Sequence, residues 1–205
     1  MMEDNNKFDK TIQTYKDKFD TYTERTPSEM NGESKEWADS FLMRLPENSK
    51  ILEFGSATGR DARYFKSKGF EVTCTDIIPE ALKNLEEEGF KTEVYDFRDN
   101  PKEEWRHSFD GFFANGVFVH ASQEVLEKNL KNISEIIKPN GYAAISLKNG
   151  VGDEISERKL EAPVYYKYYT EPELREIILK SNFEISELTY SHEGLWMRLI
   201  LELKK

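Results

Sequence analysis

The spacing of apolar residues along the chain changes near residue 50. Before it, residues 7–20 and 34–45 carry apolar side chains at helical intervals, and a turn-rich stretch, residues 26–32, separates them. From Lys50 onward, short β-branched or aromatic runs alternate with helical segments, which is typical of βαβ units and a mostly parallel sheet. The pattern therefore predicts two N-terminal helices followed by an α/β unit.

The α/β unit is expected to alternate regularly between strands and helices. Pro79 suits the first turn of a helix, and the run Pro139-Asn140-Gly141 is a stop signal before the next strand. The strands are expected near residues 50–54, 70–75, 91–95, 109–114 and 141–147, and the helices near residues 60–68, 79–89 and 122–137.

The C-terminal part is expected to hold an insertion, a helix and a hairpin. Residues 148–169 are rich in glycine and tyrosine and differ from the preceding units, so they are interpreted as an insertion. Thr170 and Glu173 form a capping-box pattern that opens a helix ending near residue 181. The strand-like runs 183–190 and 195–203 are separated by only a short turn, so they should pair antiparallel. A single domain over residues 1–205 is predicted.

Composition narrows the class of partner. The chain has 39 acidic and 29 basic residues and a net charge of −10, so its field repels nucleic acid and anionic membranes. No apolar run reaches the roughly 18 residues of a membrane span. The first residues are acidic and polar, unlike a signal peptide. A cytoplasmic protein is expected, with no membrane partner and no nucleic acid.

Neither metal nor disulfide chemistry is expected. The single cysteine, Cys74, lies in an apolar strand-like run and is interpreted as a buried small hydrophobe, with a reactive thiol as the alternative. The three histidines, His107, His120 and His192, are scattered without ligand spacing, so no metal site is predicted.

A small-residue loop follows the first predicted strand. Gly55 and Gly59 allow positive φ angles and let backbone amides approach a nucleotide, while the following helix presents free N–H groups. The dinucleotide fingerprint would place glycines at positions 57 and 60, where this chain has Ala57 and Arg60. A pyrophosphate-binding site for a nicotinamide cofactor is therefore not expected.

Acidic residues lie at or just after the ends of the first three predicted strands. Glu53 opens an acid-x-Gly-x-x-x-Gly pattern, Asp76 ends the second strand, and the pair Asp96-Phe97 follows the third. Asp76 lies 21 positions after Gly55, where a βαβ unit brings a carboxylate to ribose hydroxyls. With these motifs, roughly residues 10–203 resemble the Rossmann-like (class I) S-adenosylmethionine-dependent methyltransferases.

This resemblance implies a Rossmann-like three-layer α/β sandwich. Its sheet would be mostly parallel and seven-stranded, with an antiparallel strand from the C-terminal hairpin. It also implies S-adenosylmethionine as cofactor and S-adenosylhomocysteine as product. Glu53 would orient the methionine end, Asp76 would bind the ribose, and Asp96 and Phe97 would contact the adenine. Further cofactor contacts are implied at Gly55, Ser56, Ala57, Gly59, Ile77, Ala114 and Asn115.

The N-terminal helices, residues 1–45, are expected to include a lid. Tyr15, Phe19 and Tyr22 follow one another at helical spacing, and an amphipathic stripe must be buried against something. By resemblance, Tyr15 and Tyr22 would border the cofactor; simple packing against the sheet edge is the alternative.

The loops after strands four and five should face the acceptor, because ligands bind beyond the carboxyl ends of parallel strands. His120 is a candidate general base, or else a packing residue. Lys148 could hold an anionic acceptor, or it could simply be solvated. Tyr166 and Tyr168 share one strand face, and Tyr165 and Tyr169 share the other. Substrate contacts are expected from Lys148, Tyr166, Tyr168 and Tyr169, within the insertion 148–169, with aromatic packing as the alternative.

The expected activity is methyl transfer to oxygen, nitrogen or sulfur of a small molecule. The run Asn115-Gly116-Val117 lacks the two prolines of amino-methylating DNA enzymes, and Cys74 is on the wrong strand for cytosine C5 chemistry. Methylation of a protein or RNA remains an alternative, as does binding of S-adenosylmethionine without transfer. The sequence indicates neither the acceptor nor the oligomeric state.

Overall fold

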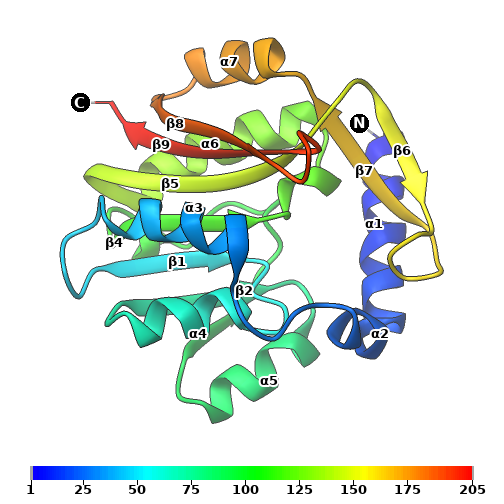
Figure 1. Ribbon diagram of the computed structural model, residues 1–205, viewed down its shortest axis with the longest axis horizontal. Coiled ribbons are helices and arrows are strands. Elements are labelled where there is room, and N and C mark those ends of the chain that lie inside the picture. Colours follow the sequence, from blue (N-terminus) through cyan, green and yellow to red (C-terminus); the bar gives the residue numbers. More distant parts are fainter. Residues whose placement is uncertain (1, 205) are drawn as a thin grey trace.

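The computed structural model describes residues 2–204, with side chains from residue 6 onward. Three helices precede the sheet: α1 (Met2–Asp17), α2 (Phe19–Glu24) and α3 (Gly32–Leu42) (Figure 1). The helix expected over residues 7–20 is thus two helices, because the backbone leaves the helical region at Lys18, where φ is −119° and ψ is 23°. Of these helices, α1 crosses the end of the sheet and α3 covers one of its faces.

Five parallel strands form the centre of the sheet, in the order β3-β2-β1-β4-β5. An α-helix connects β1 to β2, β2 to β3 and β4 to β5, as the alternating pattern predicts, and only a short 3-10 helix lies between β3 and β4. The strands are β1 (Lys50–Phe54), β2 (Glu71–Asp76), β3 (Lys91–Val94), β4 (Phe109–Asn115) and β5 (Ile137–Asn149), and the helices are α4 (Arg60–Ser67), α5 (Pro79–Glu87) and α6 (Gln123–Ile136). Short 3-10 helices occur at Glu103–Trp105 (η1) and Phe118–His120 (η2).

The C-terminal hairpin brings the sheet to seven strands, and the hairpin of the insertion brings it to nine. After α7 (Glu171–Leu179), strand β8 (Phe183–Ser191) pairs antiparallel with β9 (Trp196–Leu203), and β9 pairs antiparallel with β5. The capping box at the start of α7 is present, because the Thr170 hydroxyl accepts the Glu173 backbone N–H and the Glu173 carboxylate accepts the Thr170 N–H. The expected Rossmann-like sheet with its antiparallel hairpin is confirmed.

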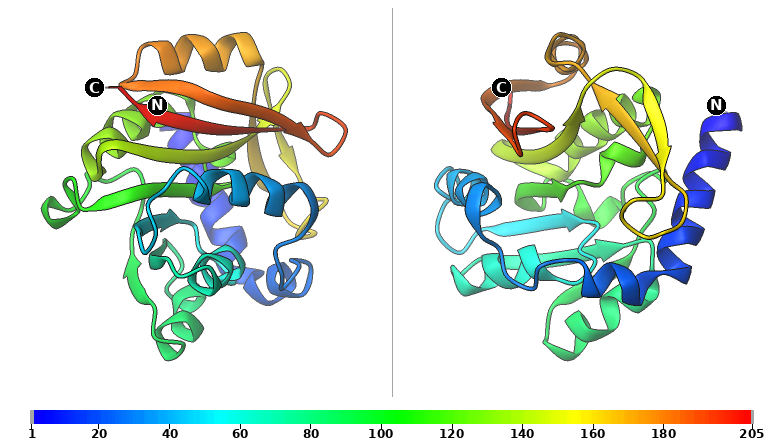
Figure 2. Two further views of the ribbon diagram at one scale, coloured as in Figure 1. Left: turned by 60° about the vertical axis from the view of Figure 1, so that its left-hand side comes forward. Right: turned by 45° about the vertical axis from the view of Figure 1, so that its right-hand side comes forward.

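The insertion adds a second hairpin, which the sequence pattern did not specify. Strands β6 (Asp153–Ser156) and β7 (Val164–Tyr169) pair antiparallel, and β7 attaches to the carboxyl end of β5 at Lys148 and Asn149. The hairpin stands beside α1 in the views of Figures 1 and 2. The two are joined directly, because Thr11 Oγ1 accepts the Tyr165 backbone N–H at 2.9 Å and Thr14 Oγ1 donates to the Pro163 carbonyl at 2.8 Å.

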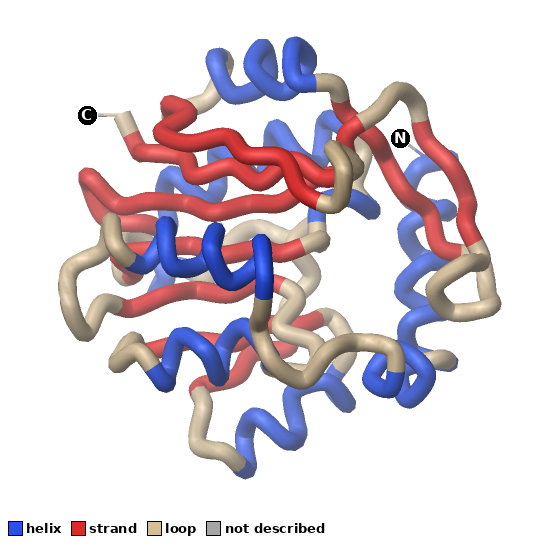
Figure 3. Tube along the Cα trace, viewed as in Figure 1, coloured by secondary structure: helices blue, strands red, loops and turns tan. Residues whose placement is uncertain are grey.

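Two apolar clusters fill the two sides of the sheet and produce three layers (Figure 3). Helices α6 and α7 contribute to one cluster, which also holds Phe8 of α1, and helices α3, α4 and α5 contribute to the other. Cys74 lies fully buried in the second cluster, and this burial raises the pKa of its thiol, as expected for a small hydrophobe. Within residues 2–204, no helix is long and apolar enough to cross a membrane.

Candidate functional site

Two adjoining cavities lie at the carboxyl ends of the parallel strands. The first encloses about 110 Å³ and is mostly apolar, and the second encloses about 730 Å³ and is more polar. Helix α1 and the hairpin β6–β7 cover this edge of the sheet. The two cavities share the wall residues Tyr15, Tyr22, Asn115, Gly116 and His120.

The loop after β1 borders the first cavity through a left-handed backbone. The φ angles of Gly55, Ala57 and Gly59 are 65°, 45° and 76°. A Cβ on Gly55 would lie 2.6 Å from Val117 Cγ2, and one on Gly59 would lie 2.3 Å from Leu85 Cδ2. Gly55 and Ala57 line the cavity, whereas Gly59 is required for packing against α5 and the turn into α4.

Asp76 points into the same cavity from the end of β2. Its Oδ2 accepts the Ala57 backbone N–H at 3.0 Å and its Oδ1 accepts the Ile78 N–H at 2.9 Å. The residue is 8% exposed and forms no ion pair with any described side chain, so burial raises its pKa to about 6. Asp76 is thus a buried acceptor with spare lone pairs at a cavity wall, suited to a ligand that donates hydrogen bonds.

Glu53 lies behind the loop. It is 3% exposed, and its Oε2 accepts the Ser56 hydroxyl at 2.6 Å. Burial, and then the negative charge of Asp61, raise its pKa to about 8. Asp61 is itself held by an ion pair with Arg60 and by the Asn115 amide, which donates to it at 2.9 Å. The loop therefore rests on a buried polar network.

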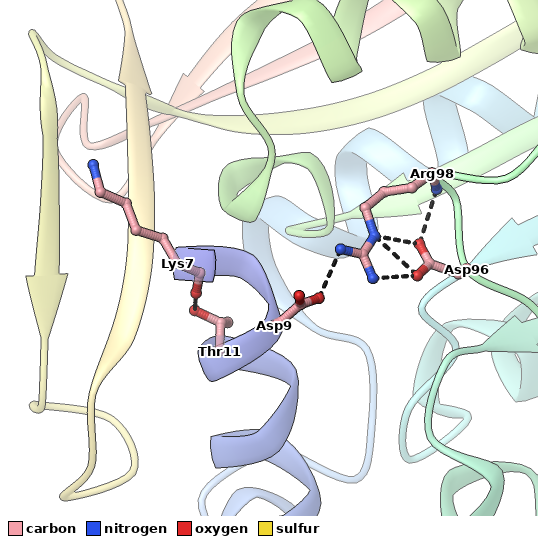
Figure 4. A network of polar contacts seen from close by, with 5 residues as sticks. All are labelled: Lys7, Asp9, Thr11, Asp96 and Arg98. Atoms are coloured by element: carbon pink, nitrogen blue, oxygen red, sulfur yellow. Dashed lines mark hydrogen bonds and ion pairs between the residues drawn. The ribbon is translucent and has the colours of Figure 1, made fainter. Parts of the chain in front are cut away.

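Asp96 does not line either cavity. Figure 4 shows its carboxylate facing the Arg98 guanidinium, with Arg98 Nη2 at 2.6 Å from Asp96 Oδ2. Arg98 Nη1 also donates to Asp9 Oδ1 of α1 at 2.7 Å, and the guanidinium lies 4.4 Å from the centroid of the Phe8 ring. These contacts form a latch that joins α1 to the loop after β3, and the adenine contact of Asp96 stays a prediction.

An aromatic stripe of α1 and α2 forms the outer wall of the first cavity. Tyr15 and Tyr22 are among the residues of this stripe, and their rings meet edge to face with centroids 5.5 Å apart. Phe8 and Ile12 also belong to it, although the sequence analysis did not name them. Their signal was available, because the stripe simply extends the same spacing backwards: Phe8, Ile12, Tyr15, Phe19, Tyr22.

His120 separates the two cavities. Its Nδ1 lies 2.6 Å from the Tyr165 carbonyl oxygen, which can only accept, so Nδ1 carries the proton. Nε2 therefore accepts a hydrogen bond from the Tyr15 hydroxyl at 3.2 Å. Burial lowers the pKa of His120 to about 4, so the imidazole is neutral near pH 7. His120 links α1 to β7 rather than presenting a free lone pair to a ligand.

The second cavity brings together residues from distant segments. Lys148, Tyr166 and Tyr168 line it, as predicted. Tyr169 does not: it is 1% exposed in the apolar core, because neighbouring residues of a strand point to opposite faces. The predicted substrate contact of Tyr169 is therefore wrong.

Most, but not all, of the other predicted contacts lie on a cavity wall. Those on the wall of the first cavity are Tyr15, Tyr22, Gly55, Ala57, Asp76, Ile77, Phe97, Asn115 and His120. Those on neither wall are Glu53, Ser56, Gly59, Asp96 and Ala114.

Four further residues of the second cavity, cationic or aromatic, carry no signal in the sequence pattern. Arg158 and Lys159 come from the turn between β6 and β7, and Trp196 and Arg198 come from β9. No local motif marks them, because tertiary folding alone brings these segments together.

The chain matches a known protein family over most of its length. A family model described as a methyltransferase domain matches residues 27–188. The chain belongs to this methyltransferase family. A search of curated proteins gives no match.

Solved structures of other methyltransferases share the fold. The 1,6-didemethyltoxoflavin-N1-methyltransferase of Burkholderia thailandensis, crystallised with 1,6-didemethyltoxoflavin and S-adenosylhomocysteine, has a TM-score of 0.72 at 20% identity, over 95% of this chain and 85% of that one. An S-adenosylmethionine-dependent methyltransferase from Methanosarcina mazei has a TM-score of 0.68 at 18% identity, over 80% and 95%. A third, from Mesorhizobium loti, has a TM-score of 0.66 at 14% identity, over 80% and 96%. The expected class I methyltransferase that uses S-adenosylmethionine is confirmed in family, fold and enzyme class.

Proposed function

We propose that this methyltransferase binds S-adenosylmethionine in the first cavity and methylates a small-molecule acceptor in the second. The observation that carries this proposal is the common wall between the two cavities, where an apolar chamber with a buried carboxylate meets a larger polar chamber. The first cavity alone is smaller than an ordinary ligand site of roughly 300–1,000 Å³. The cofactor would therefore extend across the shared wall toward the acceptor.

The residues of the first cavity fit the cofactor. The buried carboxylate oxygens of Asp76 form no ion pair with a described side chain, so they can accept hydrogen bonds from ribose hydroxyls. Phe97 and Ile77 provide an apolar wall for an adenine ring, and the backbone at Gly55 and Ala57 is open to close approach. When bound, S-adenosylmethionine supplies a methyl group on a positively charged sulfur.

The chain's own contribution is to position the reactants and exclude water. Methyl transfer depends on the alignment of nucleophile, methyl and sulfur, so no strong base is obligatory. Tyr15 and Tyr22 cover the shared wall, and His120 holds Tyr15 in place through its neutral imidazole. His120 is accordingly a positioning residue in this proposal, and the N-terminal helices act as the lid.

The size of the second cavity favours a small molecule over a macromolecule. Its volume of about 730 Å³ suits a metabolite-sized ligand, and residues of the hairpin β6–β7 and of the N-terminal segment line it. The structurally similar B. thailandensis enzyme holds a small molecule, 1,6-didemethyltoxoflavin. This likeness supports the same kind of acceptor here.

Transfer of a radiolabelled methyl group tests the proposal. The protein is incubated with methyl-labelled S-adenosylmethionine and, separately, with small metabolites, tRNA or protein from one cell extract, with an Asp76→Ala variant as the control. Label should enter the metabolite fraction with the wild-type protein and fall by about tenfold or more with the variant. Label found only in tRNA or protein would refute the small-molecule acceptor, and absence of label from every fraction would refute transfer.

A further inference from the structure

The second cavity reverses the charge balance of the chain. Acidic residues outnumber basic ones in the whole sequence, 39 to 29, yet basic side chains dominate this wall. The carboxylates that line it are Glu29, Glu33 and Glu154. The Arg and Lys residues that line it are Arg25, Arg60, Lys148, Arg158, Lys159 and Arg198.

Among the described side chains, only two of these cations have a carboxylate partner. Arg25 pairs with Glu161, and Arg60 pairs with Asp61. Among the side chains that the structure describes, no carboxylate lies within ion-pair distance of the other four: Lys148, Arg158, Lys159 and Arg198.

Arg198 is the most costly of the four to leave without an anion. It is 4% exposed, and its Nη2 donates to Ser34 Oγ at 2.8 Å, while Nε and Nη1 have no hydrogen-bond partner in the part of the chain that the structure describes. Burial of the guanidinium, together with the positive charge of Arg60, lowers the pKa of Arg198 despite the nearby Glu33. An uncompensated buried charge is strongly unfavourable, so the cavity gains free energy when an anion enters.

Aromatic rings fix the positions of the two lysine ammonium groups. Lys148 Nζ lies 4.5 Å from the Tyr166 ring centroid and 5.4 Å from those of Tyr168 and Trp196. Lys159 Nζ lies 4.2 Å from the Tyr22 ring centroid, although the residue as a whole is exposed. Cation–π contacts hold each ammonium without neutralising it, so the charge stays available to a ligand.

The lysines also repel each other through the cavity. Although Lys159 as a whole is exposed, its ammonium group lies against the Tyr22 ring, and desolvation there, then Arg60 and Lys148, lower its pKa to about 8. Burial lowers the pKa of Lys148 as well, with Arg158 adding to the effect and Glu154 opposing it. An anion between the ammonium groups would relieve this repulsion.

We propose that the methyl acceptor is a small anion whose carboxylate or phosphate group is bound by Lys148 and Lys159, with Arg158 and Arg198 adding positive potential. The proposal rests on the proposed function, because it assigns the acceptor to the second cavity. Neutral and cationic analogues of the acceptor are disfavoured, since they leave the cations uncompensated.

The test uses full-length protein saturated with S-adenosylhomocysteine and matched probes. Binding of benzoate and phenyl phosphate is measured by calorimetry against that of benzamide and benzyl alcohol, which have similar shapes without the charge. We expect the anions to bind about tenfold tighter or better than their neutral counterparts. Lys148→Met and Lys159→Met should each reduce this preference to about threefold or less, because methionine fills the space without the charge.

Controls separate the acceptor from the cofactor's own carboxylate. Lys180→Met makes the same chemical change on an exposed helix end, where Lys180 pairs with Glu176, and should leave the preference intact. The dissociation constant of S-adenosylhomocysteine should stay within about twofold in the Lys148 and Lys159 variants. If it weakens as much as anion binding does, the cations serve the cofactor and the proposal is overturned.

The remaining outcomes are also decisive. If benzoate and phenyl phosphate bind no better than their neutral counterparts to the cofactor-saturated protein, the acceptor is not selected by charge and the inference fails while the proposed function stands. If S-adenosylhomocysteine does not bind the wild-type protein, the proposed function itself fails. Methyl transfer confined to the fraction of a metabolite extract that an anion-exchange resin retains would support the anionic acceptor, and transfer confined to the unretained fraction would overturn it.

Discussion

Replacement of Asp76 by alanine should weaken S-adenosylhomocysteine binding by roughly 10- to 150-fold. Hydrogen bonds to a charged group contribute about 1.5–3 kcal/mol, and about 1.4 kcal/mol corresponds to a tenfold change in the dissociation constant. Asp76 is 8% exposed, so its carboxylate is already desolvated before the ligand arrives. This places the expected loss in the upper part of the range.

The same substitution should alter the stability of the fold in a pH-dependent way. It leaves the backbone N–H groups of Ala57 and Ile78 without their acceptor, which costs roughly 1–3 kcal/mol each. The rise of the Asp76 pKa from 3.8 to about 6 opposes this loss above pH 6, because a carboxylate held at the higher pKa costs roughly 3 kcal/mol to keep ionised.

The direction of the pH dependence follows from the difference between the folded and unfolded pKa values of Asp76. The folded pKa exceeds the unfolded one, so Asp76 contributes most to stability below about pH 4, and this contribution is lost as the pH rises through about 6. The variant should therefore be clearly less stable than the wild type near pH 4 and nearly as stable near pH 8. Ligand binding should show the opposite trend, because the wild type loses affinity as Asp76 becomes protonated below about pH 6.

Calorimetry with S-adenosylhomocysteine and denaturant unfolding, each at about pH 5 and about pH 8, measure both effects. Asp110→Ala is the matched control, because Asp110 also accepts a backbone N–H, from Lys50, but lines neither cavity. It should leave the dissociation constant unchanged. A folded Asp76→Ala protein with wild-type affinity at both pH values would refute the assignment of Asp76 to the cofactor site.

Three further substitutions test the network around the cavities. Glu53→Gln should make the free energy of unfolding less dependent on pH. The raised pKa of about 8 makes the stability of the wild type fall as the pH rises through 8, and glutamine does not titrate. If urea unfolding gave the same change of stability with pH for both proteins, this prediction would be contradicted. His120→Asn should lower turnover without removing any inflection between about pH 5 and 8, since His120 is already neutral there; an inflection that only the wild type shows would contradict it. Arg98→Met should speed amide hydrogen exchange in residues 8–17, with little change in global stability because the ion pairs are partly exposed. Arg106→Met, an exposed pair away from α1, is its control, and equal exchange in both variants would exclude the latch.

The fold could be predicted well from the sequence, because the spacing of apolar residues and the residues that form turns determine each helix and strand locally. Parallel strands buried on both faces read as short apolar runs, and βαβ crossovers bring their carboxyl ends together. Asp76 could therefore be placed at that edge from its position alone, and it lies there. The break at Lys18 was missed because the apolar stripe continues through it in register.

The site was less predictable where tertiary contacts override the pattern. Tyr169 belongs to the same tyrosine run as Tyr166 and Tyr168, but strand alternation turns it into the core. Asp96 carries the expected motif, yet Arg98 occupies its carboxylate. Arg198 gave no signal at all, because its role depends on β9 lying beside β5.

The hydrogen bonds between α1 and the β6–β7 hairpin have a consequence for the catalytic cycle. Thr11 and Thr14 connect the cover of the first cavity to the wall of the second, and Arg25 adds a bond from Nη1 to the Lys159 carbonyl at 2.8 Å. We therefore expect one opening event to uncover both chambers, so that methylated product and spent cofactor would leave through a shared exit. Their release rates should rise and fall together, and a steady-state turnover limited by that exit would be insensitive to the intrinsic reactivity of the acceptor.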